Sequence, residues 1–150
     1  MKSLTIFYIA LRLFLGGYMV YGGIGKFTKP MPEPTTMIEQ LENEGPEKLK
    51  SDMRTLKIRN YIFGMKQTGY AWQLVGIAEI VCGLLILSQY LSFIGAVMLV
   101  PVTLQIFFFH LYLEPDEMGE LLLTASLLLA NLLLIGKEWS RWKGLVLVKP

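Results

Sequence analysis

The charged residues of this 150-residue chain are almost absent from its long apolar segments, and this uneven distribution limits the fold more than any other feature. Arg12 is the only charged residue between positions 4 and 25, and Glu79 is the only one between positions 70 and 113. Overall, 53% of the residues are apolar and 17% are charged, against about 45–50% and about 25% in average soluble domains. The sequence therefore predicts a chain that resides in lipid. It argues against a disordered chain, a disulfide scaffold and a protein with a nucleic-acid partner.

Four segments have the length of a membrane-spanning helix, which needs about 20 mostly apolar residues. They cover residues 4–25, 70–87, 91–113 and 119–136. The first lacks a small-x-small cleavage site and contains Arg12, so we expect a retained helix rather than a signal peptide. The sequence thus predicts an all-α fold over residues 1–150: a single integral membrane domain, built as a four-helix bundle with a polar, partly helical insert at 26–69. Four spans leave both termini on one side, side A, and the insert on the other, side B.

The insert begins with three prolines between positions 30 and 34, which exclude a helix there. Residues 36–39 match a capping box and predict the start of a short helix. Residues 47–63 place apolar side chains on one stripe and most basic side chains off it. This pattern is typical of a helix in the membrane interface, with lysine and arginine at the headgroups. A small extramembrane cap folded over the bundle explains it equally well. In either case the insert is a candidate surface for a protein partner or a homo-oligomer.

The orientation signals conflict, because the insert contains more basic residues than side A but mixes them with acidic ones. The positive-inside rule gives most weight to short flanks. The flanks on side A carry Lys2, Lys137, Arg141, Lys143 and Lys149, with Trp139 and Trp142 as expected interfacial anchors. We therefore expect the termini to be cytoplasmic.

Arg12 and Glu79 are each about 12 Å from the side-A end of their segments, at 1.5 Å per residue. Each of the two charged residues shares a face of its helix with two glycines. Small residues at such spacing let membrane helices approach closely. These glycines are Gly16 and Gly23 in the first segment, and Gly76 and Gly83 in the second. The sequence therefore predicts that the first two spans touch and that Arg12 pairs with Glu79.

Two interpretations of this pair stay open. It either fixes the register of two helices, or it lines a cavity that binds a polar headgroup or carries protons. A guanidinium keeps a neighbouring carboxylate ionised, and this favours binding over proton transfer.

Further polar side chains lie within the apolar segments. Gln73 and Gln105 are each about 21 Å from side A and are expected to hydrogen-bond across the hairpin of the second and third spans. Asn131 shares a face with Glu120 and Thr124, which we expect to point inward. His110 lies about 140° around its helix from Gln105, so we expect the two not to face the same centre.

The chain offers little support for metal or thiol chemistry. His110 is followed by four carboxylates within ten residues, and imidazole with carboxylate oxygen suits zinc, iron or manganese. One nitrogen ligand at a spacing without an established motif is too little, so we predict no metal site and a histidine hydrogen-bonded at the membrane boundary. Cys82 is the only cysteine, which excludes a disulfide or a CxxC pair within one chain. Pro101 is expected to kink the third span.

Three stretches resemble the DoxX family of small bacterial membrane proteins. Residues 68–85, which contain Trp72, Gln73 and Glu79, resemble its second helix. Residues 98–113, with Pro101-Val102 and Phe109-His110, resemble its third. Arg12, the glycine pairs at 16–17 and 22–23, and Lys26 resemble its first. The insert is where this sequence departs from the family pattern.

The resemblance implies a four-helix protein of the bacterial inner membrane, in a family named for its association with quinone-linked oxidases. It supplies no catalytic mechanism. We expect a non-catalytic subunit, or a binder of a lipid-like or quinone ligand in the bundle, surrounded by membrane lipid. The alternative is a quinone-reactive subunit of an oxidoreductase complex, and a transporter is disfavoured because four helices leave little room for alternating access. The candidate ligand-binding residues are Arg12, Gln73, Glu79, Gln105, His110 and Asn131.

Overall fold

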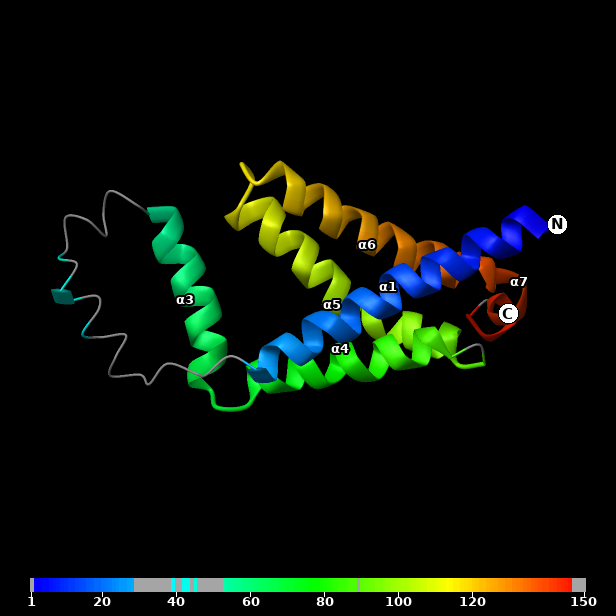
Figure 1. Ribbon diagram of the computed structural model, residues 1–150, viewed down its shortest axis with the longest axis horizontal. Helices are drawn as coiled ribbons and strands as arrows, with labels where there is room; N and C mark the ends of the chain where they lie inside the picture. The colour runs from blue at the N-terminus through cyan, green and yellow to red at the C-terminus, as the bar shows by residue number, and fades with distance from the viewer. Residues whose placement is uncertain are drawn as a thin grey trace.

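Four apolar helices form a bundle in the computed structural model, which describes residues 2–28, 39, 42–43, 45, 53–88 and 90–146. They are α1 (Lys2–Thr28), α4 (Ala71–Leu87), α5 (Ser92–Leu113) and α6 (Met118–Lys137). The described residues form no strand, so the prediction of an all-α helical membrane bundle is confirmed. Figure 1 shows both termini at one end of the bundle, side A, and the helix of the insert at the other, side B.

The four helices coincide with the predicted spans to within about three residues at each end. α1, α5 and α6 are each long and apolar enough to cross a membrane. α4 has 17 residues and passes the same test only together with α3 (Met53–Gln67), from which it is bent by 86°. α5 runs through Pro101 as one helix.

α1 and α4 pack through glycines, as the sequence predicted. A Cβ atom on Gly23 would lie 2.7 Å from the carbonyl oxygen of Gly76, and one on Gly16 would lie 2.9 Å from that of Gly83. Real side chains do not approach a backbone so closely, so the absence of a side chain allows this contact.

The register of this contact differs from the predicted one. Gly16 lies beside both Gly83 and Leu87, so Arg12, one turn earlier, is level with the end of α4. Glu79 lies beside Gly22 instead. The equal depth expected for Arg12 and Glu79 is therefore wrong by about 12 Å. The expectation assumed that the helices end in one plane, whereas α1 has 27 residues against 17 in α4.

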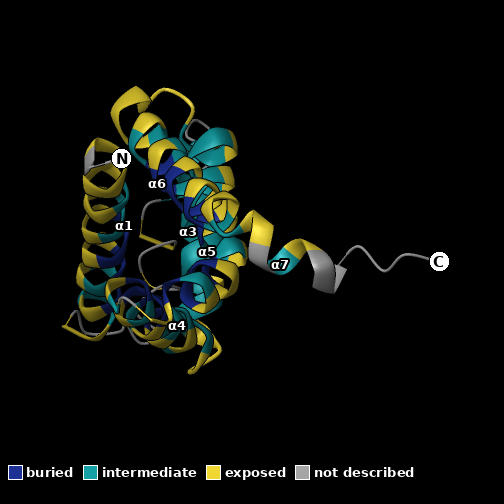
Figure 2. Cartoon of the chain, turned by 90° about the vertical axis from the view of Figure 1, so that its right-hand side faces the viewer, coloured by how far each residue is buried: buried dark blue, intermediate teal, exposed yellow. Residues whose placement is uncertain are grey.

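The bundle encloses a narrow core and leaves its outer surface apolar. In Figure 2 the buried residues lie on the inner sides of the helices and the exposed ones outside. The buried core consists of Leu15, Met19, Cys82, Ile86, Ala96, Leu99, Leu127, Ala130 and Leu134. Exposed large apolar side chains include Ile6, Leu13, Leu74, Leu122 and Leu129. An outward apolar surface of this extent is that of a protein surrounded by acyl chains. Thr124 and Asn131 point inward as expected, whereas Glu120 is exposed.

α3 lies across the side-B end of the bundle. The chain turns between α3 and α4 at Gly69, whose φ of 75° favours glycine. The Thr68 hydroxyl accepts a hydrogen bond from the backbone N–H of Ala71, the first residue of α4. The helix expected at 47–63 is thus present from Met53 and ends at Gln67. Residues 47–52, and 36–38 of the expected capping box, lie outside the described residues.

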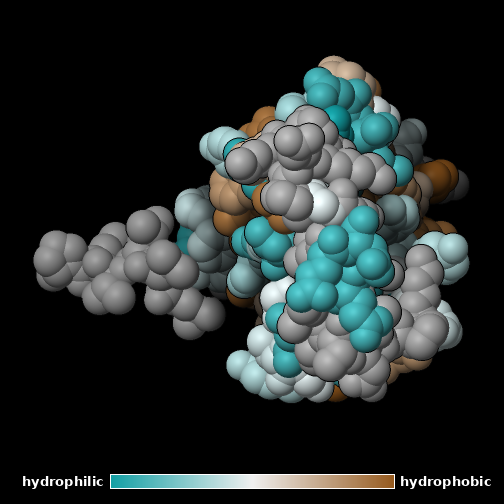
Figure 3. All heavy atoms as spheres, turned by 90° about the vertical axis from the view of Figure 1, so that its left-hand side faces the viewer, coloured by the Kyte–Doolittle hydropathy of each residue, from teal (hydrophilic) through white to brown (hydrophobic). Residues whose placement is uncertain are grey.

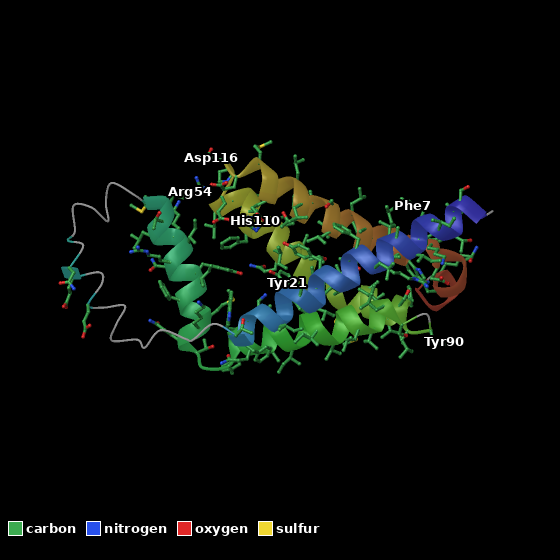
Figure 4. All side chains as sticks on the ribbon, in the orientation of Figure 1. Phe7, Tyr21, Arg54, Tyr90, His110 and Asp116 are labelled. Carbon is green, nitrogen blue, oxygen red and sulfur yellow. The ribbon has the colours of Figure 1, made fainter. Side chains whose placement is uncertain are left out.

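Arg54 connects α3 to the end of α5 and to the turn after it. Arg54 donates to the carbonyl oxygen of Leu113 at 3.1 Å and to Asp116 at 2.9 Å, and Figure 4 shows Arg54 beside Asp116. Among the residues that Figure 3 colours at this end of the molecule, many are hydrophilic. The position of α3 fits a cap folded over the bundle, and its contact with lipid headgroups stays a prediction.

We expect Arg54→Gln to loosen α3 without unfolding the bundle. Arg54 and Asp116 have side chains 38% and 81% exposed, so their pairing contributes at most about 1 kcal/mol. Hydrogen exchange should become faster in residues 53–67 and stay unchanged in α5 and α6. Lys57→Gln, at an exposed position of the same helix, is the control. Equal exchange in both variants would contradict the assigned role of Arg54.

A short helix, α7 (Trp139–Val146), follows α6 at side A. The indole N–H of Trp142 donates to the carbonyl oxygen of Ile135 at 3.1 Å, and its ring stacks on Phe93 at a centroid distance of 6.2 Å. In Figure 2, α7 leaves the bundle sideways. Trp139 and Trp142 belong to α7, directly after the end of a spanning helix, and tryptophans at such a position are typical of a membrane boundary.

Candidate functional site

A cavity of about 500 Å³ lies between α1, α3, α4 and α5, and we call it the α3 cavity. Its polar or amphipathic lining residues are Tyr18, Lys26, Tyr61, Trp72, Glu79, Gln105 and His110. Its remaining lining residues are Met19, Gly22, Ile62, Met65, Val75, Pro101, Val102, Ile106 and Phe109. Because α3 contributes Tyr61, Ile62 and Met65, the insert completes the cavity.

Glu79 is paired with Lys26 in the wall of this cavity. Lys26 Nζ lies 2.6 Å from Glu79 Oε2, and the two side chains are 16% and 3% exposed. The same ammonium group lies 5.2 Å from the ring centroid of Trp72, within the range of a cation–π contact. The predicted Arg12–Glu79 pair is therefore wrong. Lys26 is the partner because α1 continues to Thr28, and because the glycine contact brings Glu79 beside Gly22, one turn before Lys26.

Arg12 lies outside the α3 cavity, about 21 Å along α1 from Lys26. It is half-buried, and its Nε is enclosed without a hydrogen-bond partner. A ligand contact made by Arg12 would thus belong to another part of the molecule.

Gln105 and His110 both line the α3 cavity, contrary to the expectation that they face different centres. Gln105 Nε2 donates to Tyr61 Oη of α3 at 2.5 Å. His110 Nδ1 lies 2.8 Å from Glu114 Oε2, four residues further along the chain. The expectation considered α5 alone, whereas α3 covers a second face of α5 and extends the cavity around it. Figure 4 shows His110 on the bundle side of α3, near the end of that helix that carries Arg54.

Gln73 and Asn131 do not line the α3 cavity. Asn131 is fully buried and donates through Nδ2 to Thr103 Oγ1 at 3.1 Å, which joins α6 to α5. Gln73 is half-buried in α4. A ligand-binding role for these two residues stays a prediction.

No group of three or more His, Cys, Asp or Glu side chains in the described part of the chain could hold a metal ion. Cys82 is a free, buried cysteine in the core. The polar chemistry of the cavity therefore rests on an ammonium group, a carboxylate, an imidazole, an amide and the hydroxyls of Tyr18 and Tyr61.

Four of the polar or amphipathic cavity residues were missed by reasoning from the sequence: Tyr18, Lys26, Tyr61 and Trp72. The sequence contained a signal for Lys26. Gly16 and Gly23 are seven residues apart, as are Gly76 and Gly83, so matching the two pairs in antiparallel order gives the observed register. Tyr61 carried no such signal, because its position depends on the 86° bend between α3 and α4.

The comparison with known families identifies the chain. The DoxX family model matches residues 7–111, which include α3, α4 and most of α1 and α5. The protein is a member of the DoxX family and, with its several apolar helices, a multi-pass membrane protein. No curated protein and no solved structure matches the chain.

Proposed function

We propose that this protein is a non-catalytic membrane subunit or binder that holds a lipid-like ligand, such as a quinone, in the α3 cavity. The observation that carries the proposal is the Lys26–Glu79 pair, nearly withdrawn from solvent, in the wall of a largely apolar cavity. A charge in an apolar environment is costly unless it is paired, and intramembrane ionisable residues are frequently functional.

The size and lining of the cavity fit a small amphiphile. A volume of about 500 Å³ is within the range of roughly 300–1,000 Å³ typical of small-molecule sites. Lys26 has further N–H groups beyond the one directed at Glu79, and Gln105 and His110 add donors or acceptors. A head group with oxygen acceptors would meet these groups, while Met19, Val102 and Ile106 would contact its apolar part.

We expect Val102→Trp to abolish ligand retention. Val102 lines the cavity, so an indole there would fill much of its volume. Native mass spectrometry of the purified protein should show a bound species of a few hundred daltons in the wild type and a more than tenfold smaller bound fraction in the variant. The control is Val97→Trp, because Val97 is an exposed residue of the same helix. Equal retention in both variants, or no bound species in the wild type, would overturn the proposal.

The alternative function, a quinone-reactive subunit of an oxidoreductase complex, requires that the protein bind a quinone specifically. A short-chain ubiquinone should then bind to the detergent-purified protein in competition with the retained species, and Glu79→Gln should weaken its binding. If palmitate competes and ubiquinone does not, the ligand is an acyl lipid and the quinone assignment fails. Extraction with organic solvent and an ultraviolet redox difference spectrum would identify a quinone that is already bound.

The location and partners that we propose are those expected from the sequence: the bacterial inner membrane, termini in the cytoplasm, and a protein partner or second copy at the insert. Lys137, Lys143 and the tryptophans of α7 at side A support this orientation, since positive charge near span ends favours the cytoplasmic side. Cysteine labelling of Ser140→Cys in inside-out and right-side-out vesicles would test it. Labelling only in right-side-out vesicles would reverse the orientation.

A further inference from the structure

A second polar site lies at side A, at the opposite end of the bundle from the α3 cavity. We propose that Arg12, with Lys137, binds the phosphate of an anionic phospholipid there. Arg12 is half-buried in a helix of apolar residues. Its Nε is enclosed by protein without a hydrogen-bond partner, so a ligand from the membrane would meet the two Nη groups. Within the described part of the chain, the guanidinium forms no ion pair. An arginine in such surroundings requires a counter-charge, and membrane lipid can supply it.

The depth of Arg12 matches that of a phosphate group. It is level with Leu87, where α4 ends and the chain turns into α5. Tyr8 lies one turn earlier on the same face of α1, and Lys137 Nζ of α6 is 4.9 Å from the centroid of its ring. Lys137 therefore contacts Tyr8, and Arg12 lies one turn further along the same face of α1. The carboxylate of Glu138 lies 4.0 Å from this ammonium, a loose contact that leaves room for a stronger acceptor.

The surroundings of Arg12 favour a lipid over a carboxylate from another protein. Its neighbours Ile9 and Leu13 are 49% and 62% exposed, so a lipid bound at Arg12 would lay its acyl chains along α1. Trp139 and Trp142 mark the headgroup level at the same end. Guanidinium binds phosphate through two parallel N–H groups, and an adjacent lysine adds charge without fixed geometry.

Lipid retention by the full-length protein provides the test. Detergent-purified protein is mixed with equal amounts of dioleoyl-phosphatidylglycerol and dioleoyl-phosphatidylcholine, and bound lipid is measured by native mass spectrometry. The wild type should retain phosphatidylglycerol at least about tenfold better, the gain expected from one charge-assisted hydrogen-bonded contact. Arg12→Gln should remove most of this preference, and Lys137→Gln should reduce it. Lys57→Gln, an exposed lysine of α3, should leave it unchanged.

Three results would overturn the proposal. The first is an unchanged lipid preference in Arg12→Gln. The second is displacement of the lipid by millimolar inorganic phosphate alone, which would indicate a free-anion site. The third is a wild type that proves to be an oligomer and is dissociated by Arg12→Gln without loss of lipid, which would assign Arg12 to a contact with a second copy. Should Arg12→Gln fail to fold, the wild type and Arg12→Lys still decide the matter, because phosphatidylglycerol should raise the Tm of both more than phosphatidylcholine does.

Discussion

Gly23→Ala should destabilise the protein by about 2–3 kcal/mol, although it adds a single methyl group. The new Cβ would lie 2.7 Å from the carbonyl oxygen of Gly76 and 2.6 Å from Ile80 Cγ1. The side chain of Ile80 can move, but the carbonyl belongs to the backbone of α4. The two helices must therefore separate, and the Lys26–Glu79 pair across the same contact would be disturbed with them.

Gly17→Ala is a matched control for this substitution. A Cβ on Gly17 would meet no atom within 4 Å, and alanine favours a helix over glycine by up to about 1 kcal/mol. This variant should therefore be neutral or slightly stabilised. Unfolding can be followed by circular dichroism during titration of a mild detergent with dodecyl sulfate. If both alanines had the same effect, close packing of α1 on α4 would not be a source of stability.

The spans were predictable because the thickness of the membrane sets the number of consecutive apolar residues that a spanning helix needs. The predicted segment at 70–87 became α4 at Ala71–Leu87, and the one at 91–113 became α5 at Ser92–Leu113. α1 extended further, to Lys2 and Thr28, because a lysine ends an apolar stretch without ending a helix. The 86° bend after α3 was not predictable, since Gly69 indicates a turn but not its angle.

The candidate site was only partly predictable, for a related reason. Glu79, Gln105 and His110 were selected as polar residues in apolar segments, and all three line the α3 cavity. The choice of Arg12 as the partner of Glu79 failed because charge pairing was inferred from depth. The depth of a residue was counted from the end of its own helix. The register of α1 against α4, by contrast, depends on which small residues of the two helices are in contact. Lys26 was assigned to the insert because it is charged, although its ammonium group contacts Glu79 within the bundle.

Lys26→Met should be the most damaging of the substitutions considered, with a loss of about 3–5 kcal/mol at neutral pH. It would leave the carboxylate of Glu79, only 3% exposed, without its cation. Glu79→Gln should cost less, because the amide can still accept a hydrogen bond from Lys26. The ammonium group of Lys26 is 16% exposed and lies 5.2 Å from the centroid of the Trp72 ring, so solvent and the cation–π contact still stabilise it in this variant.

A double-mutant cycle separates this pair from the one expected at first. Lys26→Met combined with Glu79→Leu should recover most of the stability lost in Lys26→Met, because no buried charge then remains unpaired. Arg12→Leu combined with Glu79→Leu should be additive to within about 0.5 kcal/mol, since the two residues are about 12 Å out of register. Dodecyl sulfate titration of the five variants measures both couplings. Strong coupling of Arg12 to Glu79, with none to Lys26, would contradict the glycine register and the assignment of Arg12 to a separate lipid site.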